Sequence, residues 1–149
     1  MTAANPGEAL ALAEELVYPV VVRPSYVLGG RGMEVIKSRE ELEAYLEEFS
    51  GHQGYPLLID RYLAGIELEV DAVSDGADVF VPGVMEHLER SGVHSGDSIA
   101  VFPAQSIGEA LIRQIFDCTH KLTCQFNVKG LINIQYVFAG NQLYVLEVN

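Results

Sequence analysis

Oxygen-bearing side chains near the end of the sequence are the clearest candidates for metal chemistry. Glu147 and Asn149 are two residues apart, so they share one face of an expected strand. Hard cations such as Mg²⁺ prefer oxygen ligands, and they need few protein ligands where phosphate oxygens supply the rest. Gln135 and the neighbouring Asn133 belong to the preceding strand and favour a polar cavity on the same face. The alternative interpretation is a polar strand face in contact with solvent.

Gln135 joins this face only in one register of the expected hairpin. If Gln135 lies opposite Glu147, residues 140–142 form a three-residue loop. A two-residue turn at Gly140 and Asn141 would instead place Leu146 opposite Gln135 and remove the site. The metal hypothesis therefore predicts the three-residue loop.

A glycine-rich loop over residues 28–33 is a candidate phosphate-binding segment. Glycines allow backbone N–H groups to approach phosphate oxygens closely. The loop lacks the Lys-Ser/Thr pair of a P-loop, and it joins two strands instead of opening a helix. Arg23, at the end of the preceding strand, provides a cation beside the loop. An ordinary hairpin turn is the alternative.

Two further segments carry polar residues that are suited to a nucleotide. Residues 92–98 are small and polar, and His94 among them could stack, donate to phosphate or act as a base. Residues 60–63, followed by Glu67, combine extended backbone, an apolar Leu63 and a carboxylate, which suit a heterocycle and ribose hydroxyls. A solvated loop histidine and an ordinary strand end are the simpler interpretations.

Periodicity and capping signals predict the elements that must position these residues. Helices are expected over residues 6–17, 38–49 and 106–126, with Asn5 capping the first and the pairs Ser38/Glu41 and Ser106/Glu109 forming capping boxes for the others. Gly51 is expected to end the second helix. Strands are expected over residues 20–23, 34–37, 57–62, 66–73, 79–88, 98–102, 131–138 and 143–149. This mixture without a βαβ rhythm indicates the α+β class, with two lobes spanning residues 1–63 and 64–149.

Composition limits the possible partners. The net charge is −12 with only nine Lys and Arg residues among 149, so the chain lacks the basic face expected of a nucleic-acid-binding protein and of a protein that binds an anionic membrane. No apolar run is long enough to span a bilayer, and the first residues do not form a signal peptide. We therefore expect a cytoplasmic protein.

Together these stretches resemble the large subunit of carbamoyl-phosphate synthase. The resemblance is carried by residues 18–33, 67–72, 92–98 and 144–149 and runs from about Ala9 to Asn149. It implies a partial ATP-grasp fold with two subdomains and the nucleotide site between them. The loop Gly-Gly-Arg-Gly-Met at residues 29–33 resembles the second half of that subunit, which phosphorylates carbamate.

The resemblance also implies roles for individual residues. Arg23 would contact ATP phosphates, Arg61 and Leu63 would lie at the adenine, and Glu67 would bind ribose. The nucleotide pocket would be lined by Gly92, Val93, His94 and Ser95. Gln135 and Glu147 would contact both nucleotide and metal, Asn149 would complete the metal site, and the cation would be Mg²⁺ or Mn²⁺.

The implied reaction transfers a phosphoryl group from ATP to carbamate and gives carbamoyl phosphate. The implied partners are the remainder of the large subunit, a glutamine amidotransferase small subunit that supplies ammonia, and the small substrates carbamate or bicarbonate. The sequence ends where the family continues with an Arg-containing segment, so we expect a fragment that binds nucleotide weakly and does not turn over alone. Another ATP-grasp carboxylate-amine ligase and a non-catalytic ATP-grasp-like module are the alternatives.

Overall fold

A computed structural model covers the chain and describes residues 1–25, 32–49, 56–89 and 98–149. The chain divides into two compact units, Met1–Tyr62 and Leu63–Asn149. The sequence places the boundary one residue later, between residues 63 and 64. No helix in the described ranges is long and apolar enough to cross a membrane.

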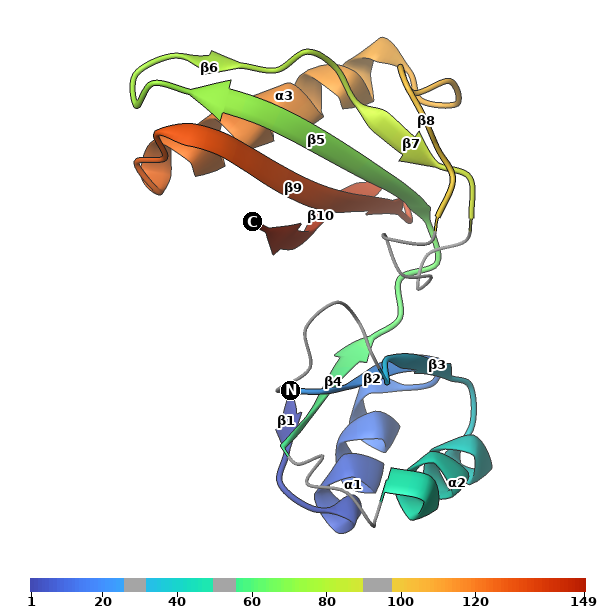
Figure 1. Cartoon of the computed structure of the whole chain (residues 1–149). Coiled ribbons are helices and arrows are strands. Elements are labelled where there is room, and N and C mark those ends of the chain that lie inside the picture. Colours follow the sequence, from blue (N-terminus) through green and yellow to red (C-terminus); the bar gives the residue numbers. More distant parts are fainter. Residues whose placement is uncertain (26–31, 50–55, 90–97) are drawn as a thin grey trace. The chain divides into compact units, whose positions relative to one another are not determined.

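The first unit packs two helices against one side of a four-stranded antiparallel sheet (Figure 1). Its elements are β1 (Thr2–Ala3), α1 (Pro6–Leu16), β2 (Val20–Pro24), β3 (Glu34–Ile36), α2 (Arg39–Phe49) and β4 (Leu57–Arg61). The sheet order is β1-β4-β2-β3, and β1 was not expected from the sequence. Val22, Ile59 and Leu42 are among the fully buried side chains that join the sheet to the helices.

The predicted caps of these helices are confirmed. The side chain of Asn5 accepts a hydrogen bond from the Glu8 N–H at 3.0 Å, and α1 begins with Pro6. Ser38 Oγ accepts from the Glu41 N–H at 3.3 Å, as the capping box predicts. The Glu41 carboxylate accepts from the Lys37 N–H at 2.7 Å, one residue before the Ser38 N–H that the box predicts. Residues 28–31 of the glycine loop and the expected helix terminator Gly51 lie outside the described residues.

The second unit packs a long helix against one face of a six-stranded antiparallel sheet. Its elements are β5 (Ile66–Ser74), β6 (Val79–Phe80), β7 (Met85–His87), β8 (Ala100–Val101), α3 (Glu109–Gln125), β9 (Gly130–Ala139) and β10 (Gln142–Val148). The order is β10-β9-β5-β7-β8, and β6 also pairs with β5. Alternate residues of β5 and β9, including Leu68, Val70 and Ile134, are buried with Ile115 of α3. Their neighbours in sequence occupy the opposite face.

A buried tyrosine links the sheet to the helix in this core. Tyr136 of β9 is fully buried, and its hydroxyl forms a 2.8 Å hydrogen bond with Thr119 of α3. Burial raises the pKa of Tyr136 above its ordinary value, so the hydroxyl stays protonated and can donate to Thr119.

The strand expected over residues 79–88 is interrupted. It forms two short strands, β6 and β7, with residues 81–84 between them outside any strand. Pro82 has no backbone N–H to donate to a ladder. Gly83 passes close to the ring of Phe102, because a Cβ at Gly83 would lie 2.7 Å from that ring.

The capping box expected at Ser106 and Glu109 is wrong. Helix α3 begins at Glu109 with Gly108 as its N-cap, and no side chain caps it. Ser106 is engaged elsewhere, since its backbone N–H donates to Glu86 Oε2 at 2.9 Å and its hydroxyl donates to Glu86 Oε1. The Gln105 N–H also donates to Glu86 Oε2, at 2.8 Å. Burial alone would raise the pKa of Glu86, but these hydrogen bonds outweigh it and lower the pKa.

Candidate functional site

Six polar side chains form two rows across three adjacent strands, on the face of the large sheet opposite α3. In the first row, Glu69 of β5 pairs with Gln135 of β9, and Gln135 pairs with Glu147 of β10. In the second row, Asp71 pairs with Asn133, and Asn133 exchanges two backbone hydrogen bonds with Asn149, at 2.8 and 2.9 Å. Directly paired residues share a sheet face. We call this set the polar grid: Glu69, Asp71, Asn133, Gln135, Glu147 and Asn149.

The hairpin of β9 and β10, which carries four of the six grid residues, differs from the sequence prediction. The predicted three-residue loop is wrong, because Gln142 pairs with Ala139 across a two-residue turn. Both turn residues, Gly140 and Asn141, have positive φ angles of 57° and 63°, as the common tight hairpin turn requires.

An irregularity further along β10 restores the pairing of Gln135 with Glu147. The ladder is regular as far as Val145, which pairs with Tyr136, and its register then shifts so that Glu147 pairs with Gln135. One extra residue, Leu146, is therefore accommodated as a β-bulge. The turn expected to abolish the site thus coexists with the cross-strand pair that the metal hypothesis needs.

A hydrogen-bond chain supports the β5 side of the grid. One carboxylate oxygen of Glu69 lies 2.9 Å from Nε2 of His87, and the other accepts from the Asn133 amide nitrogen at 2.6 Å. His87 Nδ1 lies 2.7 Å from Ser98 Oγ. The His87 side chain is 6% exposed and that of Glu69 is 18% exposed, so the pair is largely shielded from water.

Sequence reasoning missed the contact between His87 and Glu69 because it depends on a register shift. Val73 pairs with Phe80, so an uninterrupted hairpin would place Glu69 opposite Val84. Glu69 instead pairs with Met85, because the irregular residues 81–84 add one position. This shift places His87 on the same face as Glu69. Only the Pro82-Gly83 pair signals the interruption, and it does not specify its size.

The structure distributes the other predicted binding residues over both units. Arg23 of β2 is about half exposed and forms a 3.5 Å ion pair with Asp60 of β4. Arg61 ends β4 and is exposed. In the second unit, Leu63 is half-buried, and Glu67 of β5 is half-buried opposite Val137, two residues before Glu69. The predicted pocket residues Gly92, Val93, His94 and Ser95 lie outside the part of the chain that the structure describes.

The donor set of the grid fits a hard divalent cation. Glu147 and Asn149 are exposed and Gln135 is half-buried, and each offers a carboxylate or amide oxygen. Within the described ranges, no three His, Cys, Asp or Glu side chains are grouped to hold a metal ion. A cation on the grid would therefore use amide oxygens and oxygens of its ligand in addition to a carboxylate. Mg²⁺ beside phosphates is usually held by one or two carboxylates, with phosphate oxygens and waters as its other ligands.

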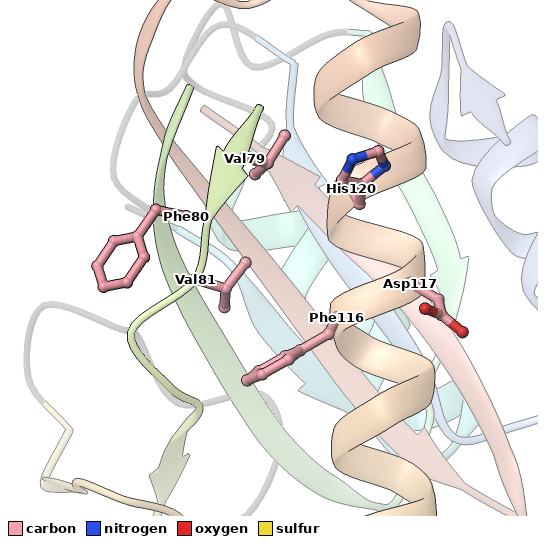
Figure 2. A pocket seen from close by; sticks show the side chains of 6 residues that line it. All are labelled: Val79, Phe80, Val81, Phe116, Asp117 and His120. Carbon is pink, nitrogen blue, oxygen red and sulfur yellow. The ribbon is translucent and has the colours of Figure 1, made fainter. Parts of the chain in front are cut away.

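One hollow of the second unit lies away from the grid. It has a volume of about 370 Å³ and lies between β6 and α3 (Figure 2). Phe80 points away from α3, while Asp117 and His120 project from the helix itself. The hollow contains none of the residues predicted to bind nucleotide or metal, so it is not the candidate site.

A family model described as the carbamoyl-phosphate synthase L chain, ATP binding domain, matches residues 1–149. The chain belongs to this family. Solved structures of ATP-grasp proteins share its fold, which confirms the predicted α+β ATP-grasp class.

Three of these structures illustrate the likeness. Biotin carboxylase from Campylobacter jejuni superimposes with a TM-score of 0.80 at 22% identity, covering 99% of this chain and 34% of that one. Carboxyaminoimidazole ribonucleotide synthase from Aspergillus clavatus, complexed with ATP, gives 0.81 at 18% identity, with coverages of 99% and 39%. D-alanyl-alanine synthetase A from Vibrio cholerae gives 0.77 at 14% identity, with coverages of 100% and 49%. The chain thus spans between a third and a half of each of these structures.

Proposed function

We propose that this chain binds Mg-ATP and serves the phosphorylation of carbamate in an enzyme of the carbamoyl-phosphate synthase type. The observation that carries the proposal is the pairing of Glu147 with Gln135, which brings oxygen donors from β9 and β10 onto one face in a member of this ATP-binding family. Asn149 joins the same face through its backbone pairing with Asn133.

The polar grid supplies the metal-binding part of the proposed site. Gln135 and Glu147 contact both nucleotide and metal, and Asn149 binds the metal. Mg²⁺, or Mn²⁺ in its place, neutralises phosphate charge when it is bound. The paired strands fix the backbone positions of these donors before the ligand binds.

The remaining binding residues are assigned by resemblance. Arg23 contacts phosphates, Arg61 and Leu63 lie at the adenine, and Glu67 binds ribose. The list of nucleotide contacts is completed by Gly92, Val93, His94 and Ser95. Glu67 has the most direct structural support, because it lies on the same face of β5 as Glu69 and is half-buried.

In the proposed reaction, a carbamate oxygen attacks the γ-phosphorus of ATP. The bond between that phosphorus and the β–γ bridging oxygen breaks, which gives carbamoyl phosphate and ADP. Such a transfer depends on positioning and charge neutralisation instead of a covalent protein intermediate. The proposed partners are the remainder of a large subunit and a glutamine amidotransferase small subunit, and the proposed location is the cytoplasm.

A second candidate is a different ATP-grasp carboxylate-amine ligase. It is favoured by the structural likeness to biotin carboxylase and to D-alanyl-alanine synthetase A. The segments at residues 28–33 and 92–98 favour the carbamate reaction, because they carry the resemblance to carbamoyl-phosphate synthase. A panel of carboxylate substrates, tested with the chain together with its proposed partner subunits, separates the two reactions.

Calorimetric titration with Mg-ATP tests the binding proposal. We expect saturable, Mg²⁺-dependent binding to the wild-type chain and binding at least about tenfold weaker for Glu147→Ala. Gln142→Ala is the matched control, since Gln142 lies on the same strand beside the turn and outside the grid. Absence of Mg²⁺-dependent binding to the wild type would favour a non-catalytic module. Equal binding by Glu147→Ala and wild type would contradict the assigned site.

A further inference from the structure

The amide of Asn133 is held in one orientation by two carboxylates. Its nitrogen donates to Glu69 Oε1 at 2.6 Å and to Asp71 Oδ1 at 2.8 Å. An ionised carboxylate only accepts hydrogen bonds, and so does an amide oxygen. If the amide were turned over, its oxygen would face two carboxylates at these distances. The chemistry of the contacts therefore fixes the nitrogen toward β5.

Glu69 is itself restrained from the other side. His87 holds its second oxygen at 2.9 Å, and Ser98 holds His87 at 2.7 Å. The Glu69 carboxylate is thus fixed between His87 and Asn133. A buried or half-buried group with two such partners keeps its geometry when a ligand binds, because little remains to be ordered.

Because the Asn133 amide nitrogen bonds to the two β5 carboxylates, the amide oxygen of Asn133 is directed away from them. Asn133 lies between Asp71 and Asn149 in its row and two residues from Gln135 along β9. Its side chain therefore lies on the face that carries the proposed metal-binding residues. A carbonyl oxygen there attracts a divalent cation and repels phosphate oxygens.

We propose that Glu69 and Asp71 are positioning residues that direct the Asn133 amide oxygen toward the bound cation, and that Asn133 is a further metal-contact residue. The inference rests on the proposed function, because it places Mg-ATP on this face. Without the two carboxylates the amide can rotate and present its NH₂ group, which a cation repels. The affinity of the site for the cation therefore depends on Glu69 and Asp71, although neither of them touches the ligand.

The test measures Mg-ATP affinity by calorimetry and Mn²⁺ affinity by electron paramagnetic resonance, using the full chain. The variants are Asn133→Ala, Glu69→Ala, Glu69→Gln and the double variant Glu69→Ala/Asn133→Ala. Asp117→Ala on α3 is the control outside the grid. We expect about tenfold weaker binding for Asn133→Ala and a smaller loss, about fivefold, for Glu69→Ala, because Asp71 still accepts from the amide. The double variant should bind no more weakly than Asn133→Ala.

Glu69→Gln separates orientation from charge. It removes the same negative charge as Glu69→Ala but keeps an oxygen that accepts from Asn133. We expect it to bind within about threefold of wild type, because the Asn133 amide stays oriented. Far-UV circular dichroism checks the fold of every variant. If Asn133→Ala fails to fold, the Glu69→Ala and Glu69→Gln pair still decides the matter, since both retain Asn133.

Three results would overturn the inference alone: wild-type affinity in Asn133→Ala, equal weakening in Glu69→Gln and Glu69→Ala, or multiplying effects in the double variant. A wild-type chain that fails to bind Mg-ATP would overturn the proposed function, and this inference with it.

Discussion

Replacement of Glu86 by alanine should loosen the attachment of α3 to the large sheet. The Glu86 side chain enters from β7, where it lies opposite Leu68, and the residue is 7% exposed. It accepts three hydrogen bonds from the segment that leads into α3, two from Ser106 and one from Gln105. The carboxylate therefore fixes the chain three residues before the helix begins.

The size of the effect follows from these contacts. A hydrogen bond to a charged group contributes about 1.5–3 kcal/mol. Gln105 and Ser106 are exposed, so water can reach their donors in the variant, and a smaller loss of about 1 kcal/mol for each bond is appropriate. Glu86→Ala should therefore cost about 3 kcal/mol, and Glu86→Gln about half of that, because it keeps one acceptor oxygen.

Hydrogen exchange measured by mass spectrometry provides the assay, because it reports the two units separately. Peptides covering residues 98–112 should exchange about 100-fold faster in Glu86→Ala, and peptides from α2 should be unchanged. Glu109→Ala is the control, since the sequence places Glu109 in a capping box and the structure gives it only an exposed contact with Arg113 at 3.5 Å. Wild-type exchange in Glu86→Ala, or a larger effect in Glu109→Ala, would refute the reasoning.

The same contacts predict a pH dependence. The folded-state pKa of Glu86 is lower than the ordinary value of 4.5, so its stabilisation is complete above pH 4.5 and is lost as the pH falls through the folded-state pKa. The difference in unfolding free energy between wild type and Glu86→Gln should therefore shrink below pH 4.5. Urea denaturation between pH 3 and 7 measures it, and a constant difference would show that the charge of Glu86 contributes nothing.

Two further substitutions test the backbone geometry. Gly65→Ala should destabilise the second unit by about 2 kcal/mol in urea denaturation, because its Cβ would lie 2.3 Å from the carbonyl oxygen of Phe138, whereas a Cβ at Gly108 meets nothing within 4 Å and Gly108→Ala should have a much smaller effect. Deletion of Leu146 should remove the bulge, keep Glu147 opposite Gln135 and preserve Mg-ATP affinity in calorimetry. Deletion of Val148 should instead move Asn149 to the other face and weaken binding, and equal effects of the two deletions would contradict the register.

The sequence correctly predicted those features that depend on residues close together in the chain. The cap at Asn5, the cap at Ser38 and the alternation of residues 66–73 each depend on neighbours within four positions, and each is confirmed. The predicted start of α3 was wrong because it depends on a residue that is distant in sequence. Ser106 had a suitable local partner in Glu109 but bonds instead to Glu86, which is 20 residues away and reaches it only through the sheet.

In the candidate site too, short-range spacing was predicted correctly and long-range register was not. Sequence spacing placed Glu147 and Asn149 on one face, and the hairpin between residues 131 and 149 exists. The sequence predicted the pairing of Gln135 with Glu147 but assigned it the wrong turn, because a β-bulge has no dependable local sequence signature. The contact between Glu69 and His87 depends on a register shift of one residue within residues 81–84, which the alternation of polar and apolar residues does not reveal.

The bulge at Leu146 has a consequence for comparing this hairpin with others. The distance along the chain from Gln135 to Glu147 is compatible with a three-residue turn and a regular ladder, or with a two-residue turn and one bulged residue. Hairpins of either kind place Gln135 and Glu147 opposite each other on the same face. An alignment that puts every length difference into the turn would misplace the residues between the turn and Leu146 while leaving the grid correct.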